Sequence, residues 1–330
     1  MRASLAALTL VVAAACTGNK AVLPTTASAP GPTSTSASGS PQTTRASTPS
    51  TPASSTAAAP CGRARPPPAR YDHVVWIWME NHSVDAILGA AAPTPFERRL
   101  AAACGAGTAY RAVGSPSLPN YIGATSGSTH GIFDDGSPSV HPIDTDNLFR
   151  QVRDSGGTAR SYEEAMRSNC QLDSIGTYAV KHNPQAYFSD PADRAACQRD
   201  NVPLGDLSGG ALVDALTTGT LPTFSFITPD LCHDTHDCGV AEGDAWLEQW
   251  VTPILASAAY QDGRTAVFIV WDEPTPMPII VISPTTPSAT SSTVAFDHYS
   301  LLRTTEEVLG VGPPLGQAAT ASSMRTDFHL

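Results

Sequence analysis

The sequence predicts a single α/β domain in which a mostly parallel sheet is sandwiched between helices. Three observations favour this fold class. Apolar runs of strand length, such as VVWIWM at 74–79 and AVFIVW at 266–271, lack polar alternation, as expected for strands buried on both faces. Segments with the apolar spacing of helices alternate with these runs. Several of the runs also end in polar side chains, where the loops of such a sheet carry function.

The expected elements follow one another through residues 71–330. Strands are predicted at 72–81, 108–113, 221–230, 265–273 and 278–284. Helices are predicted at 95–104, 147–157, 209–219, 243–260 and 298–310. Trp246 and Trp250 recur at helical spacing and are expected in the core. Gly310 is the expected stop of the last helix.

The N-terminal region is typical of an exported protein. Residues 1–15 combine Arg2 with a short apolar stretch and form a predicted signal peptide. Residues 16–70 hold a candidate lipidation site, Cys16, and a disordered linker rich in Ser, Thr, Pro and Ala. Removal of Cys16 with the signal peptide is the alternative. In both cases we expect a cell-surface lipoprotein or a secreted protein, with the membrane contacted only through a lipid anchor.

The cysteine count agrees with export. Seven cysteines are present, and without Cys16 six remain for three disulfides in an oxidising compartment. Sequential pairing is the simplest of the possible connectivities. It would join Cys61 to Cys104, Cys170 to Cys197 and Cys232 to Cys238.

The charge balance limits the partners. The chain of 330 residues has a formal net charge of −11 and no basic stripe, which argues against nucleic acid. Small phosphorylated molecules and phosphoinositides stay possible, because a bound metal ion can reverse the field within a site.

Two predicted strands end in adjacent oxygen-bearing side chains. Glu80 and Asn81 end one run, and Asp272 and Glu273 end another. Adjacent carboxylates repel, so a site that gathers them usually holds a cation. We therefore predict one divalent metal ion at these residues: Mg²⁺, Ca²⁺ or Mn²⁺ by ligand type, or Zn²⁺ or Fe if histidine contributes.

The segment GSPSLPNYIGATSGSTHGI, residues 114–132, has the composition of a nucleophile at a helix start. Pro119 is tolerated in a first helical turn, which places Ser117 at the helix N-terminus. There the helix dipole favours both an alkoxide and an incoming phosphate. A simple N-cap role for Ser117 is the alternative.

Several motifs together resemble one family. WMENHSVD, SPSLPNYIGATSGSTHGI, YAVKHNP, TPDLCHDTHDC, WDE and DHYSLLRTTEEVLG resemble, in the same order, the bacterial phosphoesterase family of acid phosphatases and non-haemolytic phospholipases C. The resemblance covers residues 71–330 and implies the alkaline-phosphatase-like fold. It also implies that Ser117 is the nucleophile and a metal ligand.

The resemblance assigns roles to further residues of this sequence. It implies catalytic roles for Asn120, His236 and His298. It implies substrate binding by Lys181, His182 and His233.

We therefore expect an exported, metal-dependent acid phosphatase that hydrolyses phosphate monoesters through a phosphoserine intermediate. Phosphatidylinositol 3-phosphate or another phosphoinositide, nucleotides and sugar phosphates are the expected substrates. The alternatives are a phosphodiesterase or phospholipase C, and a surface-binding lipoprotein with a degenerate site.

Overall fold

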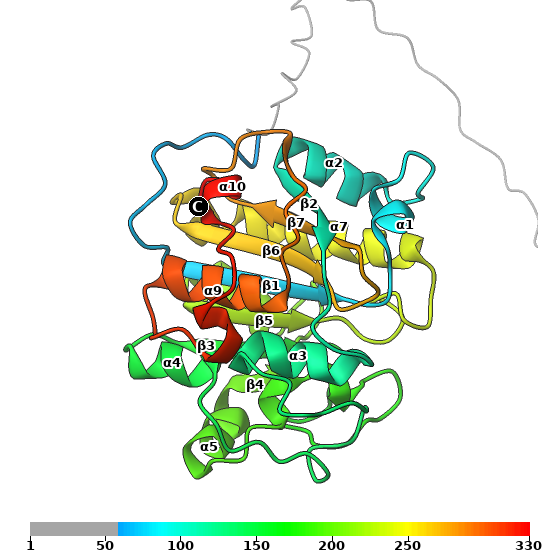
Figure 1. The fold of residues 1–330 in the computed structure, drawn as a ribbon, viewed down its shortest axis with the longest axis vertical. Coiled ribbons are helices and arrows are strands. Elements are labelled where there is room, and N and C mark those ends of the chain that lie inside the picture. Colours follow the sequence, from blue (N-terminus) through cyan, green and yellow to red (C-terminus); the bar gives the residue numbers. More distant parts are fainter. Residues whose placement is uncertain (1–58) are drawn as a thin grey trace, which may run out of the picture. The chain divides into compact units, whose positions relative to one another are not determined.

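The computed structural model describes residues 59–330, and an eight-stranded sheet runs through them (Figure 1). The strand order is β4-β3-β5-β1-β6-β7-β2-β8, and β7 alone runs against its neighbours. The strands are β1 (His73–Met79), β2 (Gly105–Tyr110), β3 (Ala159–Glu163), β4 (Asn201–Pro203), β5 (Phe224–Thr228), β6 (Thr265–Trp271), β7 (Met277–Ile282) and β8 (Thr290–Ser292). The predicted fold class, a mostly parallel sheet flanked by helices, is confirmed.

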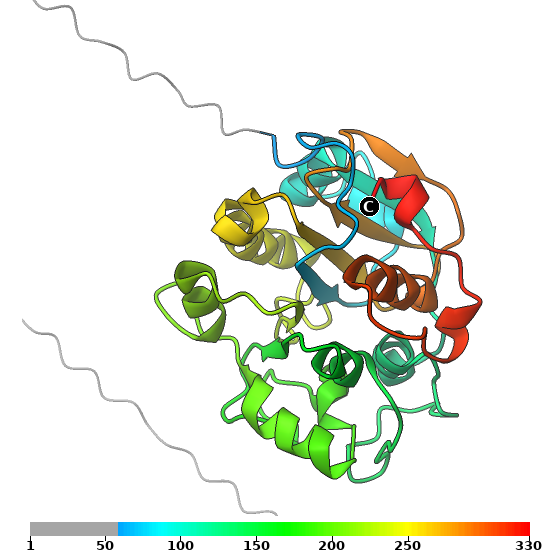
Figure 2. The same cartoon turned by 90° about the vertical axis from the view of Figure 1, so that its left-hand side faces the viewer.

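Helices cover both faces of this sheet. The α-helices are α1 (Val84–Leu88), α2 (Pro95–Ala103), α3 (Ser117–Ser126), α4 (Leu148–Asp154), α5 (Pro191–Asp200), α6 (Ala211–Thr218), α7 (Val240–Ala256), α8 (Ala258–Gln261), α9 (His298–Leu309) and α10 (Arg325–Phe328). The described residues also form three short 3-10 helices, η1 (Val180–His182), η2 (Pro184–Ala186) and η3 (Gly316–Ala319). Helices α3, α4 and α9 pack together on one face, and α2, α7 and α8 lie on the other (Figure 2).

The central strands are apolar because both of their faces are covered. Every residue of β6 is buried, and so is every residue of β1 after His73. Trp246 and Trp250 of α7 are also buried, as predicted. Helix α9 ends at Gly310, whose φ of 66° is the left-handed conformation that favours glycine.

Two predicted elements need correction, and the structure adds the direction of a third, which the sequence had left open. The strand expected at 108–113 is β2 at Gly105–Tyr110, where glycines allow close packing: a Cβ at Gly107 would lie 2.8 Å from the Ile279 side chain. β7 is antiparallel, because the connection that follows Trp271 is too short for the crossover that a parallel neighbour requires. The helix expected at 243–260 is interrupted at Ser257, which caps α8.

All three predicted disulfides are present. They join Cys61 to Cys104, Cys170 to Cys197 and Cys232 to Cys238. The predicted signal peptide, Cys16 and most of the linker lie outside the described residues. Among the residues that the structure describes, no helix has the length and apolar character needed to cross a membrane.

Candidate active site

The ends of β1 and β6 bring two of the predicted acids together. The register pairs Met79 with Trp271, so the next residues, Glu80 and Asp272, leave the sheet at the same level. The backbone N–H of Asn81 donates to Asp272 Oδ1 at 3.0 Å, and the Asn81 amide donates to Glu80 Oε2 at 3.2 Å. Two strands that are distant in sequence thus form one acidic centre.

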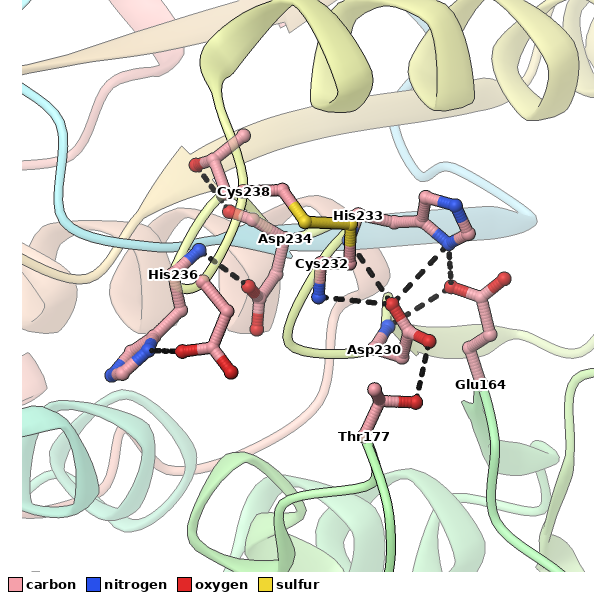
Figure 3. Close-up of a disulfide and its surroundings, with 10 residues drawn as sticks. Glu164, Thr177, Asp230, Cys232, His233, Asp234, His236 and Cys238 are labelled. Atoms are coloured by element: carbon pink, nitrogen blue, oxygen red, sulfur yellow. Dashed lines mark hydrogen bonds and ion pairs between the residues drawn. A yellow bond between two sulfur atoms is a disulfide. The ribbon is translucent and has the colours of Figure 1, made fainter. Parts of the chain in front are cut away.

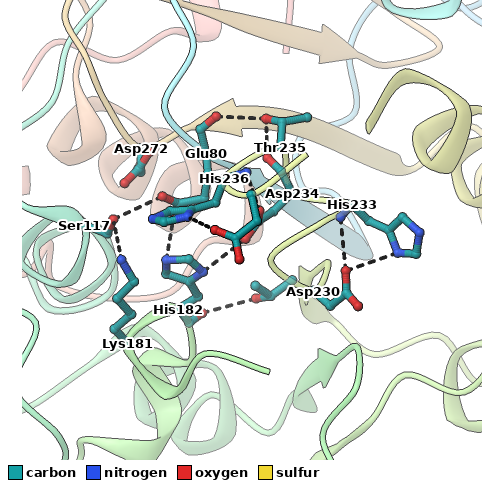
Figure 4. A network of polar contacts seen from close by, with 12 residues as sticks. Glu80, Ser117, Lys181, His182, Asp230, His233, Asp234, Thr235, His236 and Asp272 are labelled. Carbon is teal, nitrogen blue, oxygen red and sulfur yellow. Dashed lines mark hydrogen bonds and ion pairs between the residues drawn. The ribbon is translucent and has the colours of Figure 1, made fainter. Parts of the chain in front are cut away.

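Ser117 lies at this centre. It is the first residue of α3, a ten-residue helix whose N-terminus points toward the strand ends. Its buried hydroxyl donates to Glu80 Oε2 at 3.0 Å, and Lys181 Nζ lies 3.5 Å from Ser117 Oγ (Figure 4). The geometry places a hydroxyl, an acceptor for its proton and a cation within contact of one another.

A second layer of contacts fixes Glu80. The Tyr121 hydroxyl donates to Glu80 Oε1 at 2.6 Å, and His182 Nε2 lies 3.1 Å from that oxygen. His182 Nδ1 lies 3.2 Å from Asp234 Oδ2, so the imidazole lies between two carboxyl groups. The rings of Tyr121 and His182 are stacked with centroids 5.1 Å apart.

Burial dominates the electrostatics of this cluster. It raises the pKa of Glu80 well above its usual range, and the nearby Asp272 and Asp234 charges add to the increase. Burial likewise raises the pKa of Asp272 and of Asp234 to about 7. Burial and the Lys181 ammonium lower the pKa of His182. Burial and mutual repulsion therefore oppose ionisation of these three acids together unless a further positive charge compensates them.

The donor set fits a divalent cation. Asp272 Oδ1 accepts the backbone N–H groups of Asn81 and Glu273, whereas its buried Oδ2 has no hydrogen-bond partner in the described part of the chain. A buried carboxylate oxygen without a partner costs free energy that a metal ion would offset. The surrounding oxygens of Glu80 and Ser117 are the ligands that Mg²⁺, Ca²⁺ or Mn²⁺ prefer.

Two residues assigned from the resemblance, Asn120 and His298, have other contacts here. The Asn120 side chain accepts the N–H groups of Val113 and Gly114 and donates to the Gly114 carbonyl, so it orders the turn before α3. Buried His298 contacts the Asp272 carbonyl through Nε2 and the Tyr110 hydroxyl through Nδ1. Burial lowers the pKa of His298 to about 4. Both side chains therefore hold other parts of the site in place: Asn120 orders the turn before α3, and His298 contacts the backbone of Asp272.

His233 lies away from Ser117. Its Nδ1 is 2.9 Å from Glu164 Oε2 and 3.3 Å from Asp230 Oδ1, on the far side of the loop closed by Cys232–Cys238 (Figure 3). These three side chains offer ligand atoms within 4.8 Å of one another. The Asp230 and Glu164 oxygens involved already accept backbone N–H groups, so their contacts are satisfied without an ion.

The remaining assigned residues border the centre. His236 is partly exposed, its ring centroid is 6.1 Å from that of His182, and its Nδ1 contacts Asp237. Glu273 follows Asp272 directly and is partly exposed. Lys181 also forms an ion pair with Asp135 at 3.2 Å.

Two contributors were not predicted. Tyr121 is four residues after Ser117, a spacing that places both on one face of a helix and could have indicated its role. No motif or spacing in the sequence indicated that Asp135 belongs to the site. Its carboxylate accepts the Leu118 N–H at 3.0 Å, a contact formed only when the loop after α3 folds back over the helix start.

Comparison with known proteins agrees with this geometry. The model of the "Phosphoesterase family" matches residues 91–276. A phosphatidylinositol-3-phosphatase of Mycobacterium tuberculosis is 29% identical over 76% of this chain and 81% of its own length. A phosphate-repressible acid phosphatase of Penicillium chrysogenum is 26% identical over 62% of this chain, but this chain spans only 48% of that protein.

A solved structure shows the same fold. An alkaline phosphatase superfamily protein of Vibrio parahaemolyticus superposes with a TM-score of 0.52 at 14% identity. The match covers 78% of this chain and 72% of the other. The predicted alkaline-phosphatase-like architecture is therefore confirmed.

Proposed function

Because this chain belongs to the Phosphoesterase family and is a phosphoric ester hydrolase, we propose that it is an exported, metal-dependent acid phosphatase. It hydrolyses phosphate monoesters through a phosphoserine intermediate on Ser117. One observation carries the proposal: the Ser117 hydroxyl lies at a helix N-terminus, 3.0 Å from Glu80 Oε2 and 3.5 Å from Lys181 Nζ. A nucleophile, a proton acceptor and a phosphate-binding cation are the groups that covalent phosphoryl transfer needs.

Each step of the proposed phosphoryl transfer is assigned to named residues of this chain. Glu80 orients the Ser117 hydroxyl and accepts its proton while Oγ forms a bond to phosphorus. Lys181 and the N–H groups at the start of α3 bind the phosphate oxygens. The ester P–O bond breaks, and the leaving alcohol takes a proton, for which partly exposed His236 is the proposed donor. Water then hydrolyses the phosphoserine and frees Ser117.

A divalent cation, when bound, lowers the pKa of the serine hydroxyl and polarises the phosphoryl group. The residues that would hold it are Glu80, Asn81, Ser117, Asp272 and Glu273. The buried Asp272 Oδ2, which has no hydrogen-bond partner within residues 59–330, supports this ligand set. The candidate substrates are phosphoinositides, by analogy with the mycobacterial relative, together with nucleotides and sugar phosphates.

Trapping the intermediate tests the nucleophile. Brief acid-quenched exposure to ³²P-labelled substrate is expected to leave label on the peptide containing Ser117. Ser117→Ala should fold normally and lose at least about 10³-fold in turnover, because the covalent route is removed. Ser115→Ala changes an exposed hydroxyl two residues earlier and is the matched control. Label on another residue, or near-normal turnover by Ser117→Ala, would refute the assignment.

A substrate comparison tests the reaction class. Hydrolysis of p-nitrophenyl phosphate that stops with chelator and returns with a divalent ion supports a metal-dependent monoesterase. Faster hydrolysis of bis(p-nitrophenyl) phosphate would instead favour a phosphodiesterase. No hydrolysis of either ester under any metal would indicate a degenerate site.

Export is supported by the three disulfides, which are typical of oxidising compartments. We propose that Cys16 is acylated and becomes the first residue of the mature chain. Intact-mass spectrometry of membrane-extracted protein should show the acyl increment, and a soluble form that begins after Cys16 would contradict it.

A further inference from the structure

A pocket of about 310 Å³ lies beside the proposed nucleophile. The loop after α3 lines one part of it, through Asp135 and Ser137, and residues 173–181 line another. Lys181 belongs both to this pocket and to the catalytic centre, since its Nζ is 3.5 Å from Ser117 Oγ. A group attached to a phosphate held at Ser117 therefore has this space next to it.

The pocket carries negative charge. Asp135 and Asp173 line it, and Lys181 is the one cation that lines it in the part of the chain that the structure describes. Asp135 now pairs with Lys181 Nζ at 3.2 Å and accepts the Leu118 N–H at 3.0 Å. A phosphate at the start of α3 would use the same two donors, Lys181 Nζ and the Leu118 N–H, because both lie next to Ser117. Once phosphate takes them, Asp135 faces the pocket without its cation.

The rest of the wall suits a small, partly apolar group. Val180 and Leu231 line the pocket with Tyr178. The Tyr178 hydroxyl is engaged with the Gln171 carbonyl and the Asn183 amide, so it has no free donor for an anion. Carboxylates beside an aromatic ring are a common environment for ammonium groups. The volume is at the low end of the usual range for small-molecule sites, roughly 300–1,000 Å³.

We propose that this pocket is the leaving-group subsite and that it selects phosphate monoesters of small amino alcohols over esters that carry a second anion. The inference rests on the proposed function and narrows its substrate class: amino alcohol esters are favoured over phosphoinositides, whose leaving group carries a phosphodiester anion. The amino alcohol leaves with a proton as its P–O bond breaks, and its ammonium group stays near Asp135 and Asp173 until it departs. An anionic leaving group meets two like charges at the same place.

The test compares kcat/KM for three small esters. These are O-phosphoethanolamine, glycerol 1-phosphate and 3-phosphoglycerate, with cationic, neutral and anionic leaving groups. The expected order is cationic, then neutral, then anionic. In a partly solvated pocket one charge changes each ratio by roughly five- to tenfold. Asp173→Asn should reduce the preference for phosphoethanolamine over glycerol phosphate by that factor, and Asp173→Lys should reverse it.

Asp134→Asn is the matched control. Asp134 is adjacent to Asp135, but it contacts His141 and does not line the pocket, so the ratios should stay at the wild-type values. Different results would refute the proposed function and the pocket assignment. No turnover of any monoester by the wild type refutes the proposed function. Turnover of glycerol phosphate without a preference for the amine, or ratios that Asp173→Lys does not change, refutes the pocket assignment alone.

Discussion

Tyr121→Phe isolates the contact that orients Glu80. The tyrosine hydroxyl donates to Glu80 Oε1 at 2.6 Å, and the ring lies 4.5 Å from that of Trp78 and 5.1 Å from that of His182, between centroids. Phenylalanine keeps these ring contacts and removes only the hydroxyl. The substitution therefore tests the hydrogen bond without opening a cavity.

The magnitude follows from the acceptor. A hydrogen bond to a charged group contributes about 1.5–3 kcal/mol, and the Tyr121 bond is fully buried. This corresponds to a change of roughly 10- to 150-fold in an equilibrium constant. Side chains that orient metal ligands typically affect metal affinity about 10–100-fold. We expect Tyr121→Phe to weaken binding of Mg²⁺ or Mn²⁺ within that range.

Isothermal titration calorimetry of metal-free protein measures this affinity directly, and turnover at saturating metal shows whether activity returns. Tyr260→Phe is the control: its hydroxyl donates to the Pro60 carbonyl at 2.8 Å, and it precedes β6, at the strand end opposite the site. Both variants should lose stability, but only Tyr121→Phe should lose metal affinity. Equal metal affinity in wild type and Tyr121→Phe would refute a role for this hydroxyl in orienting the ligand.

Three further outcomes are expected. Burial raises the pKa of Glu306 to about 7, so its stabilising effect is present below about pH 4.5 and is lost as pH rises through 7. In urea unfolding, Glu306→Gln should thus be up to about 3 kcal/mol more stable than wild type at pH 8 and equally stable near pH 4.5. If the difference in unfolding free energy between variant and wild type is the same at both pH values, this reasoning is wrong. Chelation should lower the melting temperature as well as turnover, because Glu80 and Asp272 lose their counter-charge; a constant melting temperature would argue against a metal there. Replacing both Cys61 and Cys104 by serine should cost about 4 kcal/mol, since their disulfide closes a loop with a sequence separation of 43; a loss below about 1 kcal/mol would show that the loop stays constrained without it.

The sequence by itself determined the central strands and one half of the candidate site. Continuous apolar runs at 74–79 and 266–271 are compatible only with coverage on both faces, so they indicated the centre of a parallel sheet. Since parallel strands end at the same edge, Glu80 and Asp272 were expected to meet there, and they do. The helix start at Ser117 was predicted from local chemistry, which depends on only a few neighbouring residues, whereas its role as nucleophile came from the family resemblance and stays a prediction.

Only the tertiary structure decided which other side chains reach this centre. Asp234 and His233 are neighbours in one disulfide-closed loop, yet Asp234 contacts His182 while His233 contacts Glu164. Asp135 reaches the start of α3 from an irregular loop. The side chains of such loops do not follow the regular period of a helix or strand, because the direction of each depends on contacts with residues far away in the sequence. The strand ends follow from local patterns, whereas the loop contacts follow from how the whole chain packs.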